Sequence, residues 1–70
     1  MAIPGEIIVN KYEATYSVHL VGIRGELTVI KLKAKKIVKT SEDTTFYDYY
    51  GCVTGCFRND ILLGYATTER

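Results

Sequence analysis

Three β-type runs follow one another in AKKIVKTSEDTTFYDYYGCVTGCF, residues 34–57 of the chain. The polar segment Ser41-Glu42-Asp43 and the glycine at Gly51 separate these runs as turn signals. The runs are rich in Val, Ile, Thr, Phe and Tyr, which favour a pleated, half-buried surface. This part of the chain therefore predicts three consecutive strands, and it carries no catalytic constellation or metal-ligand set.

The clearest alternation lies upstream, in residues 12–20, which have the period of two typical of a strand with one buried face. We expect that face to carry Tyr12, Ala14, Tyr16, Val18 and Leu20. Before this strand we expect a short edge strand over Glu6–Val9, with Asn10-Lys11 as a break or bulge. After it, Gly22 and Gly25 supply the backbone freedom for a hairpin turn.

The return strand begins near Glu26 and changes parity twice. Its apolar residues shift faces between Val29 and Ile30, which predicts a β-bulge there or a preceding segment buried on both faces. Lys36 then lies on the apolar parity, which indicates a second irregularity or a side chain that reaches solvent along its stem. We expect this strand to bend strongly and to serve two parts of a curled sheet.

An aromatic strand is predicted over Thr44–Tyr50, with Phe46 and Tyr50 on one face and Tyr47 and Tyr49 on the other. A further strand follows over Cys52–Phe57, where Gly55 indicates a bend or a close approach of backbones.

Residues 59–66 end the patterned part of the chain as a last strand or as a short helix capped by Asn59 or Asp60. Gly64 favours the strand. We predict an all-β fold: a single small domain over residues 1–70, with 1–5 as a lead-in and 67–70 as a frayed tail. Its antiparallel meander of about five or six strands curls into a half-barrel or small open barrel.

Length, charge and composition limit the classes of function that the chain can have. A chain of 70 residues is marginally stable alone, which favours self-association. The net charge of +1 gives no overall attraction to nucleic acid or membrane. The longest run without charged residues, Ala14–Ile23, is far shorter than the roughly 20 residues of a membrane-spanning helix. With no signal-peptide pattern at its beginning, we expect the chain to be cytoplasmic.

The cysteines Cys52 and Cys56 would lie about 13 Å apart on an extended strand. A disulfide needs Cα atoms within about 7 Å, so an intrachain bridge is not expected there. We expect both thiols to be small buried or half-buried fillers. Together with His19 they do not make the ligand set of a structural zinc site, so no metal and no cofactor is expected.

The second half of the chain resembles a group of known proteins. Its layout of strand, polar turn, aromatic strand, glycine hairpin and final strand resembles that of short phage and bacterial β-meander proteins. The residues that carry the resemblance are Ala34, Ile37, Phe46-Tyr47-Asp48, Gly51, Val53, Gly55 and Phe57. The chain departs from that layout after Phe57, where Ile61 and Leu62 replace an aromatic residue. The resemblance implies a β-meander and a mobile-element origin, and it carries no activity and no site residues.

No acid–base or nucleophile set surrounds His19, the only histidine, so we predict that the chain is not an enzyme and has no catalytic residues. We predict a non-enzymatic binding protein that acts as a homodimer or higher oligomer, because six tyrosines exceed what one small core can hide. The candidate interface residues are Tyr50, Leu62, Leu63 and Tyr65. In line with the resemblance, it would be a phage or mobile-element accessory factor in the host cytoplasm that inhibits a host protein or sequesters a small ligand in a tyrosine-lined pocket.

The alternative is a single-stranded nucleic-acid-binding sheet, in which lysines contact phosphates and tyrosines stack on bases. Its candidate binding residues are Lys31, Lys33, Lys35, Tyr47 and Tyr49. Against this alternative, the lysines could simply protect an exposed strand from aggregation and pair with nearby carboxylates. The near-neutral total charge leads us to favour that explanation.

Overall fold

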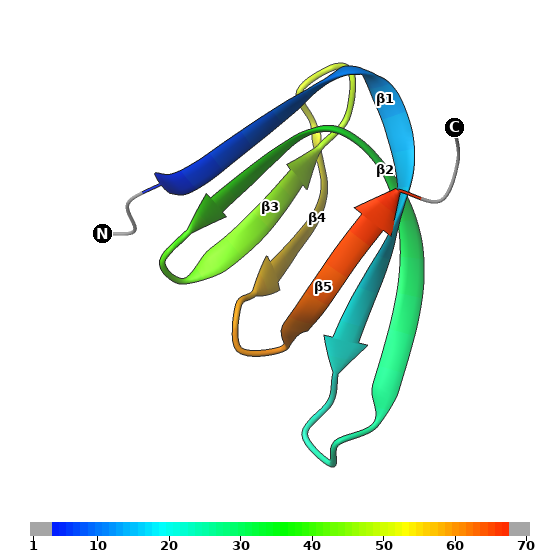
Figure 1. Cartoon of the computed structure of the whole chain (residues 1–70), viewed down its shortest axis with the longest axis vertical. Helices are drawn as coiled ribbons and strands as arrows, with labels where there is room; N and C mark the ends of the chain where they lie inside the picture. The colour runs from blue at the N-terminus through cyan, green and yellow to red at the C-terminus, as the bar shows by residue number, and fades with distance from the viewer. Residues whose placement is uncertain (1–3, 68–70) are drawn as a thin grey trace.

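Five antiparallel strands form one sheet, in the order β4-β3-β2-β1-β5, in the computed structural model of the chain (Figure 1). The structure describes residues 4–67, and none of these residues is helical. The strands are β1 (Pro4–Val21), β2 (Leu27–Thr40), β3 (Asp43–Tyr47), β4 (Val53–Arg58) and β5 (Leu62–Thr67). The sheet is not closed, so the predicted all-β fold is confirmed in the form of an open half-barrel.

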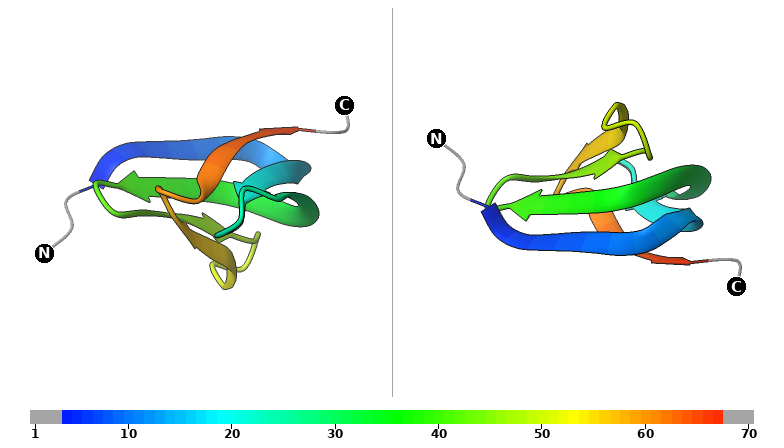
Figure 2. Two further views of the ribbon diagram at one scale, coloured as in Figure 1. Left: turned by 90° about the horizontal axis from the view of Figure 1, so that it is seen from below. Right: turned by 90° about the horizontal axis from the view of Figure 1, so that it is seen from above.

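The two long strands give the sheet its curl. β1 and β2 pair along most of their length and bend together, which folds β3 and β4 over against β5 (Figures 1 and 2). The register between them shifts between Val9 and Ala14 of β1, opposite a single residue, Lys35. Extra residues on one strand increase its bend and twist. The predicted bulge at Asn10-Lys11 and the predicted bend of the return strand are therefore confirmed, whereas the alternative of a break is wrong, because β1 is continuous through these residues.

The core lies inside this curl. It consists of Tyr16, Val18, Ala34, Ile37 and Phe46, with Ile8, Ala14, Leu20, Ile30, Leu32, Phe57, Leu62 and Tyr65 packed against it. Ala34 and Ile37 of β2 are both buried although their parities differ, because the irregularity in β1 lies opposite the segment between them. The second irregularity predicted at Lys36 is thus confirmed, and the Lys36 side chain is exposed.

Two predictions for the paired long strands are wrong. The β1–β2 register is unbroken around Val29 and Ile30, and both Leu27 and Val29 are exposed. Neither a bulge nor a two-sided burial occurs there, because the outer face of the hairpin carries no second layer. Tyr12 is 72% exposed and not buried, because it lies within the irregular segment of β1.

The aromatic strand ends three residues earlier than expected, at Tyr47. The Asp48 carboxylate accepts the backbone N–H groups of Tyr50 and Cys52, at 2.8 and 2.9 Å, and so forms a turn instead of a strand. Gly51 completes the turn with φ of 86°. Tyr50 therefore lies exposed in the turn and not on the face of Phe46.

Of the remaining local predictions, some are confirmed and others are wrong. The hairpin at Gly22–Gly25 is confirmed, although only Gly25 has a positive φ, of 83°. Residues 62–67 form strand β5, so the helical alternative is wrong. The lead-in and the frayed tail lie mostly outside the described residues, and β1 already begins at Pro4.

The prediction of buried cysteines is also wrong. Both are exposed free thiols, Cys52 in the β3–β4 turn and Cys56 on the edge strand β4. The Cys56 sulfur accepts a hydrogen bond from the Thr45 hydroxyl at 3.3 Å. Cys52 is exposed because it lies in a surface turn, and Cys56 is exposed because no other element of residues 4–67 lies over the outer face of β4.

Candidate binding surface

A hollow of about 330 Å³ opens where the bend of β1 and β2 meets the β3–β4 turn. Its lining combines cations, phenol rings and backbone. The lining residues are Val9, Lys35, Lys36, Tyr47, Asp48, Tyr49 and Gly51, which we call the tyrosine–lysine hollow. A volume of this size is at the lower end of the range of small-ligand sites.

The strand register brings the lysines to the rings. Lys36 of β2 lies opposite Tyr47 of β3, and its Nζ is 5.6 Å from the centre of the Tyr47 ring. Lys35 Nζ is 6.0 Å from the centre of the Tyr49 ring. Cations at these distances over a phenol ring are attracted to its electron-rich face. Two lysine–tyrosine pairs therefore border the same hollow.

Hydrogen bonds hold the tyrosine turn in place. The Glu13 carboxylate of β1 accepts the Tyr49 backbone N–H at 2.9 Å, which ties the turn to the irregular segment of β1. Within the turn, Asp48 N–H donates to the Cys52 carbonyl at 2.9 Å, and Gly51 N–H donates to the Asp48 carbonyl at 3.1 Å. A rigid turn lowers the entropy lost when a ligand binds to the rings it carries.

The two turn tyrosines form one exposed ring pair. The ring centres of Tyr49 and Tyr50 are 5.3 Å apart at an interplanar angle of 89°. Both rings remain largely in solvent. The edge of one ring meets the face of the other, which is a favourable geometry for aromatic pairs. Tyr49 is 64% exposed and Tyr50 is 84% exposed, so both rings are accessible to a ligand.

A third lysine–tyrosine pair lies just before Glu13 in β1. Lys11 Nζ is 5.6 Å from the centre of the exposed Tyr12 ring. Because Glu13 bonds the tyrosine turn, this pair lies at the same end of the molecule as the hollow. The alternation of residues 12–20 hid this pair, because it assigned Tyr12 to the core.

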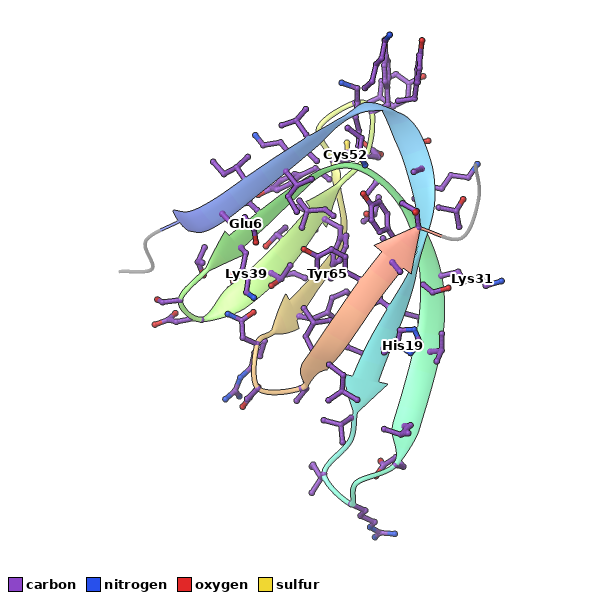
Figure 3. The ribbon with its side chains drawn as sticks, viewed as in Figure 1. Glu6, His19, Lys31, Lys39, Cys52 and Tyr65 are labelled. Atoms are coloured by element: carbon purple, nitrogen blue, oxygen red, sulfur yellow. The ribbon has the colours of Figure 1, made fainter. Side chains whose placement is uncertain are left out.

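The structure brings together only part of the predicted binding set. Lys35, Tyr47 and Tyr49 line the hollow, and the sequence reasoning missed Lys36. Lys31 and Lys33 lie opposite Ser17 and Thr15 of β1 and are not among the lining residues. Lys31 is about 13 Å from Lys35 along β2, and its side chain points away from the molecule (Figure 3).

The predicted interface residues also separate. Tyr50 and Leu63 are exposed, whereas Leu62 and Tyr65 pack against the core. Tyr65 points into the concave interior (Figure 3) and contacts the rings of Phe46 and Tyr16. Its burial raises the pKa of the Tyr65 phenol, and the nearby negative charge of Glu6 raises it further.

A larger hollow, of about 720 Å³, lies between the β2–β3 and β4–β5 turns, which are connected by hydrogen bonds of the Asn59 side chain. Asn59 joins the two turns: its side chain donates to the Thr40 carbonyl at 2.9 Å and accepts the hydroxyl of buried Thr44 at 2.8 Å.

The acidic residues around this hollow do not form a metal site, and residues 4–67 hold no group of three potential metal ligands elsewhere. Within the same range, no helix has the length and apolar character needed to cross a membrane.

No protein-family model, curated protein or solved structure matches this chain. The resemblance to phage and bacterial β-meander proteins therefore stays a prediction.

Proposed function

We propose that this chain is a non-enzymatic binding protein whose tyrosine–lysine hollow holds a ligand that combines an aromatic base with a phosphate. Such a ligand is a nucleotide, either free or within a single strand. The observation that carries the proposal is the placement of the Lys35–Tyr49 and Lys36–Tyr47 pairs around one hollow. The proposal joins the predicted tyrosine-lined pocket and the predicted strand-binding sheet, because both need the same chemistry.

The two kinds of side chain supply complementary contributions. A base stacked on an aromatic side chain contributes about 1–3 kcal/mol, whatever its identity. A lysine beside the ring neutralises phosphate, and the resulting affinity falls as salt rises. The backbone N–H of Tyr49 is bonded to Glu13, so the turn that carries the exposed ring is in place before the ligand arrives. A near-neutral total charge is compatible with such a site, because its cations are local.

The acidic residue of the hollow supports binding over catalysis. The Asp48 carboxylate accepts two backbone N–H groups of its own turn and is thus engaged in holding the turn. The other titratable groups in the lining are lysines and tyrosines. We assign them to ligand contact. The phage resemblance supports the further proposal that the chain is an accessory factor that sequesters its ligand in a host cytoplasm.

Titration of the full chain with two probes tests the proposal: adenosine monophosphate and a fluorescent single-stranded oligodeoxythymidylate, both at about 50 mM salt. We expect Tyr49→Ala to weaken binding by about 5- to 150-fold, as expected for the loss of one stacked base. Lys36→Ala should weaken binding and reduce its salt dependence. Lys31→Ala is the matched control, an exposed lysine on the same strand outside the hollow, and should leave the affinity unchanged.

The two probes separate the two sources of the ligand. Equal affinity for both probes would indicate capture of a free nucleotide, whereas a tighter, strongly salt-dependent oligonucleotide complex would indicate a strand. The proposal is overturned if neither probe binds at low salt, or if Lys31→Ala weakens binding as much as Lys36→Ala.

A further inference from the structure

The exposed Lys11–Tyr12 pair of β1 lies outside the tyrosine–lysine hollow but has the same chemistry as the two pairs that border it. Tyr12 is 72% exposed, and Lys11 Nζ is 5.6 Å from the centre of its ring. Ala14, two residues later, packs against the core, so the exposure of Tyr12 comes from the irregular segment in which it lies. Binding of one base and one phosphate in the hollow gives this pair no role.

A hydrogen bond sets the Lys11–Tyr12 pair beside the tyrosine turn. Glu13 follows Tyr12 directly, and its carboxylate accepts the Tyr49 backbone N–H at 2.9 Å. With about 3.8 Å between consecutive Cα atoms and the reach of a glutamate side chain, the Tyr12 Cα atom lies within about 12 Å of the Tyr49 nitrogen. The third pair is therefore a close neighbour of the turn that carries the rings of the hollow.

Lys35 lies between these two groups of rings. In the β1–β2 register it is the single residue opposite the irregular segment 10–13, which carries Lys11 and Tyr12. Its Nζ atom is 6.0 Å from the centre of the Tyr49 ring. One cation is thus next to both the segment that carries Tyr12 and the Tyr49 ring, so the three lysine–tyrosine pairs form a continuous surface.

The repetition of ring and cation on this surface matches a strand better than a free nucleotide. A mononucleotide has one base, so it cannot stack on a ring of every pair. A single strand presents a base and a phosphate at each nucleotide and advances about 3.4 Å per nucleotide when stacked, so about three or four nucleotides cover about 12 Å. Proteins that bind single strands combine a positively charged path with aromatic side chains on which successive bases stack.

The charges of this surface also suit a chain of phosphates. Its cations are Lys11, Lys35 and Lys36. Its carboxylates are Glu13 and Asp48, and each accepts at least one backbone N–H of the β3–β4 turn. The surface therefore keeps an excess of positive charge beside the rings, as a path for phosphates requires.

We propose that the ligand is a single strand of nucleic acid, about three or more nucleotides long, which runs from the hollow across the β3–β4 turn to the Lys11–Tyr12 pair. Tyr12 stacks on a base, and Lys11 contacts a phosphate. This inference rests on the proposed function of the hollow, because it extends the same chemistry by one more pair. It adds two binding residues that lie outside the hollow.

Calorimetric titration of the full chain tests this inference with three probes at about 50 mM salt: thymidine monophosphate and oligodeoxythymidylates of two and four nucleotides. We expect the affinity of wild type to rise at least about fivefold from the monophosphate to the tetranucleotide, as expected for one more stacked base. Tyr12→Ala should weaken tetranucleotide binding by about 5- to 150-fold, with a much smaller effect on the monophosphate. Tyr12→Phe keeps the ring and should retain the wild-type affinity.

The salt dependence gives a second, independent measurement. Lys11→Ala should lower the slope of log affinity against log salt for the tetranucleotide by about 0.7, the value of one phosphate contact in a single strand. Lys31→Ala is the matched control and should keep the wild-type slope. Both Lys11 and Tyr12 are exposed, so these variants should keep the β-sheet circular dichroism spectrum of wild type.

The outcomes separate this inference from the proposed function. If the monophosphate binds and the tetranucleotide binds no more tightly, the hollow holds a free nucleotide and only the inference is overturned. If affinity rises with length but Tyr12→Ala and Lys11→Ala both behave as wild type, the strand leaves the hollow by another route, and the inference is again overturned. If no probe binds, the proposed function is overturned as well.

Discussion

Phe46 of β3 and Tyr65 of β5 stack edge to face, with ring centres 5.3 Å apart and an interplanar angle of 85°, although β2 and β1 separate their strands in the sheet. Phe46 also contacts the rings of Tyr16 and Phe57, at 6.0 and 5.9 Å between centres. The sheet can bring its two ends this close only by curling. This aromatic cluster therefore holds the half-barrel in its curled form.

Replacement of the central ring should destabilise the fold strongly. Phe46→Leu leaves a cavity in a fully buried site and removes three ring contacts, so we expect a loss of about 2 kcal/mol or more in the free energy of unfolding. Urea denaturation followed by circular dichroism measures this change. Tyr50→Leu, in the exposed turn, is the control and should change the stability by less than about 0.5 kcal/mol. Equal effects would show that the aromatic cluster does not support the curl.

Two glycines, one on each edge strand of the sheet, should respond oppositely to alanine: Gly55 on β4 and Gly64 on β5. A Cβ on Gly55 would lie 2.8 Å from Leu32 Cδ2 and 2.9 Å from Phe57 Cε2, so Gly55→Ala overpacks the core. We expect a cost of about 1–3 kcal/mol. Gly64→Ala meets no atom within 4 Å and should be neutral or slightly stabilising. Urea denaturation of dilute protein compares the two, and an equal cost for both would contradict the close approach at Gly55.

The elements that sequence reasoning located correctly are those specified by neighbouring residues. The glycine turns and the alternation around Tyr16 and Val18 depend on backbone freedom and a period of two, which are local properties. The failures concern which face is covered. Val29 and Cys56 have apolar side chains on suitable strands, but no layer lies over them, and that depends on the curl of the whole sheet.

The candidate binding surface was likewise predicted only in part. The predicted antiparallel meander places the aromatic strand next to the lysine strand, as the structure has them, but the meander does not predict which lysines lie at the bend. A further signal was present in the sequence: Asp48 precedes Gly51 by three residues, a pattern typical of a β-turn. That pattern places Tyr49 and Tyr50 in a turn, as the structure has them.

Asn59 provides a test of how the β2–β3 and β4–β5 turns are held together. Asn59→Ala removes the acceptor of the buried Thr44 hydroxyl and the donor to the Thr40 carbonyl, so we expect a loss of about 1–3 kcal/mol in the free energy of unfolding. Asp60→Ala removes only an exposed ion pair with Arg58 and should cost less than about 1 kcal/mol. Thermal or urea denaturation ranks the two variants, and the reverse ranking would contradict the bracing role of Asn59.

The raised pKa of Tyr65 predicts how stability changes in alkali. Its phenol is neutral when protonated, and burial in the curl, together with the negative charge of Glu6, raises the folded-state pKa above the ordinary 10.0. The unfolded chain therefore gives up this proton first as pH rises. The stabilising contribution is complete below pH 10.0 and is lost as pH rises from there through the folded-state pKa.

Tyr65→Phe keeps the ring in the aromatic cluster but cannot ionise, so its free energy of unfolding should fall less steeply above about pH 10 than that of wild type. Urea denaturation at a series of pH values from neutral to alkaline measures both slopes. Tyr50→Phe, which removes an exposed phenol, should keep the wild-type slope. If Tyr65→Phe also follows wild type, the Tyr65 phenol is not desolvated by the curl. Because that desolvation requires β5 to close over β3, the pH series also tests the half-barrel itself.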